Sequence, residues 1–337
     1  MLHHRFSLLR TATTLPRYPE KRKSSSPLHG LTLPIGWLLA LLLWAANASA
    51  QQAVVDERPV MGTPWSITVY ATDTASARRA IVAAYARVES VEQSMSDYRN
   101  DSEISRLSLA PIQVWHPVSP DLYRVLHFSL QLARWSGGAF DPTVGTLSRL
   151  WRRAFRHQEF PDRTAIERAR SSVGYQYIDI CEKSMRLGRD SMRLDLGGVA
   201  KGYALDVAGE VLRRAGFRAF LIDGGGDLLL GDPPPGRAAW QVSTPVGTID
   251  TARVAIATSG ATFRYLEWEG RRYSHLIDPR TGLGIEEPRS VTVYAPTGMV
   301  ADGIASAVSV MGEAPWSDRR DQFPEVSVRW SLPMGHW

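Results

Sequence analysis

Cysteine is almost absent from this chain of 337 residues. Cys181 is the only one, which excludes an internal disulfide and a metal centre built from cysteine thiolates. It also lies far from the N-terminal segment, so there is no lipobox cysteine to carry a lipid. Cys181 ends a strand-like run, 175–181, and we expect it to be a small, partly buried residue at the end of that strand.

A surplus of charge is also lacking once the first 50 residues are set aside. The chain has a net charge of +5. The first 50 residues account for all of it, because they hold six arginines and lysines and one glutamate. Residues 51–337 are therefore neutral overall, and the sequence gives no electrostatic reason to expect a nucleic-acid partner.

Nor does the chain contain an apolar run long enough to cross a bilayer. The apolar run 35–44 has ten residues, whereas a membrane helix needs about 20. It follows a basic stretch and precedes Ala48-Ser49-Ala50, the small-residue pattern that signal peptidase cleaves. We expect residues 1–50 to be a signal peptide cut after about Ala50, and residues 51–337 to be periplasmic. An uncleaved anchor, with peripheral membrane association, is the alternative.

Common nucleotide-binding and hydrolase signatures are missing as well. The sequence has neither G-x-G-x-x-G opening a Rossmann unit nor the P-loop pattern G-x-x-x-x-G-K-[ST]. It also lacks H-E-x-x-H and G-x-S-x-G. A function must therefore be inferred from less common motifs.

Periodicity predicts helices first and short strands afterwards. Apolar residues at helical spacing predict helices over about 74–95, 120–136 and 164–172, and two later helices, 199–215 and 299–311, that end at glycines. Predicted strands cover about 64–71, 175–181, 192–196, 219–222, 239–243, 253–257 and 326–330, with a hairpin of 265–268 and 271–275.

The order of these elements favours an α+β fold. The strands follow one another without regular βαβ alternation, so we expect mixed or antiparallel sheets with packed helices. Residues 51–170 form a helix-rich half and residues 171–337 a sheet-rich half, and no linker separates them.

The segment 193–206 combines a glycine turn with a helix start. A predicted strand ends at Leu196, Gly197 and Gly198 form the turn, and a helix opens at Val199. The backbone of such a turn can approach a ligand closely, and the free N–H groups of a helix start favour an anion. Lys201 adds a positive charge that suits a phosphate. A tight connection without any ligand explains the same residues equally well.

Asp302 and Ser306 lie four residues apart on a predicted helix and therefore face the same way. A carboxylate and a hydroxyl are hard oxygen ligands of the kind that Mg²⁺ takes together with phosphate and water. The structural alternative is an Asp that interacts with the helix dipole and a Ser bonded within the helix.

His275 and Asp278 belong to the segment Tyr273-Ser-His-Leu-Ile-Asp-Pro279. His275 lies near the end of a predicted strand and is a candidate general base. Asp278 opens a turn and is a second candidate base, or a partner that orients the histidine. A hydrogen-bonded structural histidine is the alternative.

Several motifs, in order along the chain, resemble the FAD:protein FMN transferase family, formerly labelled thiamine-biosynthesis lipoproteins. They are Met61-Gly-Thr63, Met95-Ser-Asp-Tyr98, Gly138-Ala-Phe-Asp-Pro-Thr-Val144, Asp195-Leu-Gly-Gly-Val-Ala-Lys-Gly202, Asp223-Gly-Gly-Gly-Asp227, Thr258-Ser-Gly260, Tyr273-Ser-His-Leu-Ile-Asp-Pro279 and Ala301-Asp302. The resemblance implies an α+β fold that binds FAD in a cleft between the two halves. Several unlinked motifs in one order are more specific than any of them alone.

The resemblance also assigns roles to individual residues. It implies FAD contacts at Met61, Tyr98, Ala139, Phe140, Asp141, Asp195, Lys201 and His275. It implies magnesium ligands at Gly198, Asp302 and Ser306, with serine where the family usually has threonine. His275 is the implied general base, and Asp278 is the second candidate for that role.

The implied activity is a Mg²⁺-dependent transfer of FMN from FAD to a Thr or Ser hydroxyl of another protein, with release of AMP. The implied acceptor is an exported or membrane-associated subunit of a redox complex. Two alternatives remain open. One is an FAD pyrophosphatase, in which water replaces the hydroxyl, and the other is a flavin-binding protein without catalysis.

Overall fold

Seven strands form an antiparallel central sheet in the order β1-β2-β6-β7-β10-β15-β16. The computed structural model describes residues 51–260, 265–286 and 289–331, which all belong to one compact unit. The strands of this sheet are β1 (Gln52–Val60), β2 (Thr63–Ala71), β6 (Phe220–Asp223), β7 (Leu228–Leu230), β10 (Ala255–Gly260), β15 (Ser290–Ala295) and β16 (Ser327–Ser331). The α+β prediction, with antiparallel sheets and packed helices, is confirmed. The sheet takes β1 and β2 from the first part of the chain and its other strands from the second.

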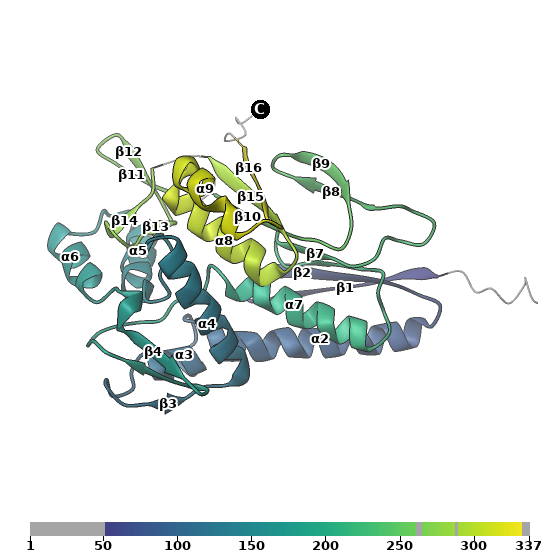
Figure 1. The fold of residues 1–337 in the computed structure, drawn as a ribbon, viewed down its shortest axis with the longest axis horizontal. Helices are drawn as coiled ribbons and strands as arrows, with labels where there is room; N and C mark the ends of the chain where they lie inside the picture. Colours follow the sequence, from purple (N-terminus) through teal and green to yellow (C-terminus); the bar gives the residue numbers. More distant parts are fainter. Residues whose placement is uncertain (1–50, 261–264, 287–288, 332–337) are drawn as a thin grey trace, which may run out of the picture. The chain divides into compact units, whose positions relative to one another are not determined.

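Three long helices cover one face of this sheet: α2 (Thr74–Met95), α7 (Ala200–Arg214) and α8 (Gly298–Met311) (Figure 1). In β2, alternation places Trp65, Ile67 and Val69 on the helix side, where they are buried. The Asp73 carboxylate begins α2 because it accepts hydrogen bonds from the N–H groups of residues 75 and 76. The apolar stripe of each helix faces the sheet and builds the main core.

A two-stranded hairpin, β8 (Trp240–Thr244) and β9 (Gly247–Thr251), packs on a second, smaller core. Its Trp240 ring lies 5.8 Å from the ring of Tyr70. Leu230 and Ile256 of the central sheet are buried in the same cluster. The two faces of the sheet are thus covered by different kinds of structure, helices on one and this hairpin on the other.

Further elements surround α2 and α8. They are α3 (Glu103–Leu107), α4 (Pro120–Trp135), α9 (Glu313–Arg319), the short 3-10 helix η2 (Arg320–Gln322) and a three-stranded sheet of β3 (His116–Pro117), β5 (Ser184–Leu187) and β4 (Ile178–Cys181). The Trp135 ring of α4 packs edge-on against Trp316 and Phe323, which joins α4 to the segment that follows α8.

A third group of elements has an aromatic core of its own. It contains α5 (Gly145–His157), α6 (Arg163–Ser171), the hairpin of β11 (Tyr265–Trp268) and β12 (Arg271–Ser274), and the pair β13 (Ile277–Asp278) and β14 (Leu283–Gly284). Phe160 stacks on Trp268 and packs edge-on against Trp151 and Tyr273. This aromatic cluster fixes α5 against the β11–β12 hairpin.

Three local predictions were wrong or incomplete. Residues 175–177 form a 3-10 turn, η1 (Tyr175–Tyr177), before β4 begins. Residues 192–196 form no strand and make only an isolated bridge between Arg193 and Val144. Cys181 is exposed, because β4 lies at the edge of its small sheet. Among the described residues, no helix combines the length and the apolar character that a membrane span needs.

Candidate functional site

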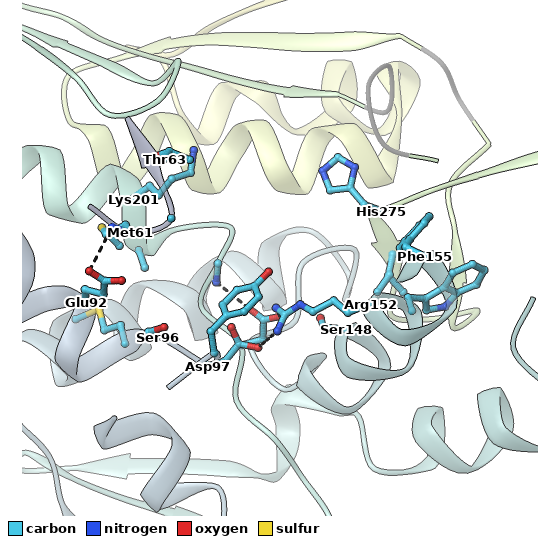
Figure 2. Close-up of a pocket in the computed structure, with 18 residues that line it drawn as sticks. Met61, Thr63, Glu92, Ser96, Asp97, Ser148, Arg152, Phe155, Lys201 and His275 are labelled. Atoms are coloured by element: carbon cyan, nitrogen blue, oxygen red, sulfur yellow. Dashed lines mark hydrogen bonds and ion pairs between the residues drawn. The ribbon is translucent and has the colours of Figure 1, made fainter. Parts of the chain in front are cut away.

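A pocket of about 710 Å³ opens where the end of α2, the helix α5, the start of α7 and the β12–β13 connection meet (Figure 2). Five of the residues with implied FAD contacts line it: Met61, Tyr98, Asp195, Lys201 and His275. The other lining residues are Gly62, Thr63, Glu92, Met95, Ser96, Asp97, Ser148, Trp151, Arg152, Phe155, Gly197, Ala200 and Ile277. Its walls are mainly apolar with a few charged groups, the usual character of a small-molecule site.

Lys201 lies in the first turn of α7, at one end of the pocket. No side chain caps the start of this helix, so its positive end faces the region of the glycine turn. The Lys201 Nζ donates to Asp227 Oδ2 at 2.7 Å, and Asp227 Oδ1 accepts from the Thr258 N–H at 3.3 Å. Burial lowers the pKa of Lys201, but the charges of Asp227 and Asp302 outweigh this effect and hold it above its usual value.

Asp302 does not line the pocket; it is buried close to Lys201, where α7 and α8 cross at two glycines. A Cβ atom on Gly202 would lie 2.1 Å from the carbonyl oxygen of Gly298, so only glycine permits this approach. Asp302 Oδ2 accepts from the Gly202 N–H at 3.0 Å. Burial and the charge of Asp227 together raise the pKa of the Asp302 carboxyl to about 7, against the opposing charge of Lys201.

The three residues implied as magnesium ligands lie together. A Cβ atom on Gly198 would be only 2.8 Å from Ser306 Oγ, so the glycine turn and the Ser306 hydroxyl are in contact, and Asp302 is one helical turn before Ser306. Among the described residues no group of three or more His, Cys, Asp or Glu side chains converges on one point. A buried carboxylate, a hydroxyl and a turn backbone nevertheless fit a Mg²⁺ ion that completes its shell with phosphate and water.

Arg152 of α5 organises the other end of the pocket. Its guanidinium donates to Asp97 at 2.5 Å and to Asp195 at 3.2 Å, and lies over the Tyr98 ring, 4.0 Å from the ring centre. Burial and the charge of Asp195 raise the pKa of Asp97 in spite of its bond to Arg152. The Tyr98 ring is 72% exposed, so the face opposite Arg152 is open to a planar ligand.

The β1–β2 turn supplies the wall beside Lys201. Met61 and Gly62 both have positive φ angles, 52° and 74°, as a two-residue hairpin turn of this kind requires. The Met61 N–H donates to Glu92 Oε2 of α2 at 3.2 Å (Figure 2). The Thr63 Oγ1 is buried without a hydrogen-bond partner among the described residues, and it lines the pocket near Lys201.

Ala139, Phe140 and Asp141, also implied as FAD contacts, do not line this pocket. All three are buried. Asp141 accepts hydrogen bonds from the Thr143 N–H and hydroxyl, at 2.8 and 2.6 Å, and from the Tyr175 N–H at 2.9 Å. Phe140 packs behind the glycine turn of the implied metal site. In this structure the three residues support the site from behind.

The two candidate bases occupy different positions. His275 is exposed, lines the pocket and lies across it from Lys201 (Figure 2). Asp278 lies outside the pocket, at the end of β13, where both its oxygens accept from the Arg280 guanidinium at 2.8 Å. The structure therefore brings His275, and not Asp278, to the pocket.

The sequence model of the ApbE family matches residues 61–329, which include every element of the pocket.

The chain belongs to the ApbE family.

Curated relatives carry one consistent description. An FAD:protein FMN transferase of Klebsiella pneumoniae is 33% identical over 280 residues, which cover 78% of this chain and 80% of the relative. An FAD:protein FMN transferase of Vibrio cholerae is 31% identical over 295 residues, with 82% and 88% covered. The predicted family membership is confirmed, and the chain is an enzyme of the transferase class.

Solved ApbE structures show the same fold. The flavin transferase ApbE from Vibrio cholerae superposes with a TM-score of 0.76 at 27% identity, covering 85% of this chain and 95% of that one. The apo form of the Pseudomonas stutzeri flavinyl transferase ApbE gives a TM-score of 0.75 at 26% identity, with 85% and 93% covered.

Sequence reasoning missed the contribution of α5 to this ApbE pocket. Ser148, Trp151, Arg152 and Phe155 line the pocket, yet the segment that carries them was not predicted as a helix. The signal was present, since Leu147, Trp151, Ala154 and Phe155 are buried at helical spacing. The role of Arg152 depends on contacts with distant segments, which no local pattern displays.

Proposed function

We propose that this ApbE-family transferase moves FMN from FAD to a Thr or Ser hydroxyl of an exported or membrane-associated redox protein, with Mg²⁺ as cofactor and AMP as the second product. The proposal rests on the residues that line the pocket. A single pocket joins an open aromatic surface at Tyr98 to a cationic helix start at Lys201. An FAD molecule has the same two parts, planar rings and a diphosphate.

The reaction is a phosphoryl-group substitution. The acceptor hydroxyl oxygen forms a bond to the phosphorus on the FMN side of the diphosphate. The bond between that phosphorus and the bridging oxygen breaks, and the bridging oxygen leaves with AMP. The hydroxyl proton passes to a base, and the product is FMN joined to the protein through a phosphoester.

Lys201 and the start of α7 would hold the diphosphate. The Lys201 ammonium stays protonated at neutral pH, since acidic neighbours keep its pKa above the usual value. Its bond to Asp227 orients the side chain along the pocket wall. A fixed positive charge in a partly buried site stabilises the negative charge that builds on the phosphate oxygens.

Asp302, Ser306 and the turn at Gly198 would hold the magnesium ion. When bound, Mg²⁺ supplies charge that neutralises the diphosphate and favours departure of AMP. The ionised Asp302 carboxylate is costly while it is buried without a cation, as its pKa near 7 indicates. This cost supports a role as a cation ligand.

His275 would accept the proton of the attacking hydroxyl. It is the histidine that lines the pocket, and it lies on the side opposite Lys201, so an acceptor entering between them would meet a base on one side and the phosphate on the other. A Ser or Thr hydroxyl is a poor nucleophile without such a base.

The direct test incubates the purified enzyme with FAD, Mg²⁺ and a candidate acceptor domain, and scores covalent flavin fluorescence on a denaturing gel. A fluorescent acceptor band that EDTA abolishes is the expected result. AMP released without a labelled acceptor would favour the pyrophosphatase, and FAD binding without AMP would favour a flavin carrier.

Export of the enzyme is part of the same proposal. The basic segment, the apolar run 35–44 and Ala48-Ser49-Ala50 support cleavage after about Ala50 and a periplasmic location. N-terminal sequencing of the protein recovered from a periplasmic extract tests it. A mature chain that begins near Gln51 is expected, and an intact N-terminus in the membrane fraction would favour the anchored alternative.

A further inference from the structure

The outward face of α5 carries a row of positive charge beside the pocket. Arg149, Arg153 and Arg156 are exposed and follow one another at helical spacing. The helix contains five arginines and histidines and no acidic residue, since its sequence is GTLSRLWRRAFRH. None of these three arginines has a hydrogen-bond or ion-pair partner within the described ranges.

This row lies next to the wall of the pocket. Ser148, Arg152 and Phe155 of the same helix line the pocket (Figure 2). Each arginine of the row follows one of these residues directly in the sequence, so it is rotated from it by about 100° around the helix axis. The charged face and the pocket face therefore run side by side along α5.

A fourth arginine, Arg193, extends the row at the first turn of α5. Arg193 lies beside the first turn of α5, where its carbonyl oxygen accepts from the Gly145 N–H at 3.1 Å. Burial and the nearby charge of Arg149 lower the pKa of Arg193, and the charge of Arg149 also acts on Asp97. Like Arg149, Arg193 has no hydrogen-bonded acid in the described part of the chain. We name Arg149, Arg153, Arg156 and Arg193 the arginine ledge.

Arginines that lie close together and have no hydrogen-bonded acid repel one another. A negatively charged partner would reduce this repulsion. The flavin does not need the ledge, because none of its four residues lines the pocket. An acceptor whose hydroxyl enters the pocket keeps its neighbouring residues at the rim, and α5 forms one part of that rim.

We propose that the arginine ledge is the docking surface for an acidic segment of the acceptor protein next to the modified Ser or Thr. This inference rests on the proposed transfer of FMN to a protein. The α5 part of the ledge is about 10 Å long, which corresponds to roughly three residues of extended chain. The acidic residues should therefore lie within a few positions of the modified hydroxyl.

The experiment compares three full-length enzymes: wild type, the ledge variant Arg149→Glu/Arg153→Glu/Arg156→Glu, and the control Arg78→Glu/Arg124→Glu/Arg237→Glu. The control arginines are exposed, lie on other elements and have side chains without hydrogen bonds or ion pairs in the described structure, and the change in net charge is the same. The probe is an acceptor domain that the wild-type enzyme labels. KM and kcat for this domain are measured at about 20 mM and about 500 mM NaCl, since salt screens exposed charges, and the dissociation constant of FAD is measured in parallel.

We expect the ledge variant to raise KM for the acceptor about tenfold at low salt, because three exposed ion pairs each contribute up to a few-fold. Its kcat and its FAD affinity should match the control, and high salt should remove most of the difference. Replacing the acidic residues of the acceptor by lysine should restore binding to the ledge variant.

Three results would overturn the proposal. An acceptor KM equal to that of the control excludes docking at the ledge. A parallel loss of FAD affinity assigns the arginines to the flavin phosphates. Loss of binding to phosphatidylglycerol vesicles with an unchanged acceptor KM assigns the ledge to a lipid surface. If wild-type enzyme turns over FAD and labels no acceptor, the proposed function itself fails, and the docking surface fails with it.

Discussion

Each end of the pocket has one cation with two acids near it, and at the Lys201 end both acids lie behind the pocket wall. At the α5 end, Arg152 donates to both Asp97 and Asp195. At the α7–α8 end, Lys201 bonds Asp227 alone, and the second acid, Asp302, accepts from a backbone N–H. A planar guanidinium can bond two carboxylates at once, whereas an ammonium is a compact charge on a flexible stem.

The two ends therefore differ in whether their acids are balanced by a cation when no ligand is bound. At the α5 end the guanidinium bonds both acids and lies over Tyr98, so this end forms a fixed wall even though burial also raises the pKa of Asp97. At the α7–α8 end, burial and the charge of Asp227 raise the pKa of Asp302 to about 7. This end would gain stability from a further cation, which is the magnesium ion of the proposed function.

Removing the Asp302 carboxylate should have the greatest effect on activity. Asp302→Asn should lower the rate of FMN transfer by at least about a thousandfold, because a catalytic metal contributes several kcal/mol to the transition state. Gel fluorescence of the acceptor measures it, with far-UV circular dichroism to establish that the variant is folded. Transfer at the wild-type rate would show that the α7–α8 end is as independent of metal as the α5 end.

An intermediate effect is expected at the other end. Arg152→Met should weaken FAD binding by about 10- to 100-fold and lower stability by about 3 kcal/mol, because it leaves two buried acids without their cation. Arg152→Lys should recover only part of both losses, since lysine cannot bond both acids in this geometry. Flavin fluorescence quenching and urea unfolding provide the measurements. Full recovery by lysine would show that charge alone, and not the fork of the guanidinium, holds this end.

A smaller effect is expected at a fifth acid, Asp206, whose carboxylate is held by backbone N–H groups. It accepts from the Gly298 and Met299 N–H groups at 2.6 and 2.9 Å, and burial raises its pKa to about 6. Because the folded-state pKa lies above the unfolded one, Asp206 stabilises the fold most below about pH 4, and this contribution is lost as the pH rises through 6.

Asp206→Asn should therefore remove about 2 kcal/mol of pH dependence between pH 4 and pH 7. Urea unfolding of both proteins at several pH values measures it. The stability difference between wild type and variant should move in favour of the variant as the pH rises. A difference that is constant with pH would mean that the native carboxyl titrates as it does in the unfolded chain.

Local patterns predicted much of the fold. The helix of residues 74–95, the glycine ends of α7 and α8, and the Glu269-Gly270 hairpin are all observed. Each depends on neighbouring residues, through capping, periodicity or turn geometry. The segment 192–196 was wrong because its apolar residues are buried by the surrounding structure rather than by pairing in a sheet.

The site was predicted less completely for a physical reason. Lys201 and Asp302 were found because each belongs to a recognisable motif. Lys201 bonds Asp227 of the β6–β7 connection, 26 positions away, and the bond from the Gly202 N–H to Asp302 depends on how α7 crosses α8. Arg152 bonds two residues that lie 43 and 55 positions away in the sequence. Contacts of this kind produce no local sequence pattern.

The most direct test of the contrast between the two ends is a calorimetric titration of Mg²⁺ into the FAD-bound enzyme, using wild type, Asp302→Asn and Asp97→Asn. Each variant removes one carboxylate beside a cation of the pocket, Asp302 near Lys201 and Asp97 on Arg152. We expect Asp97→Asn to bind Mg²⁺ like the wild type and Asp302→Asn to bind none. Equal Mg²⁺ binding by Asp302→Asn and wild type, or its loss in Asp97→Asn alone, would contradict the assignment of the metal to the α7–α8 end.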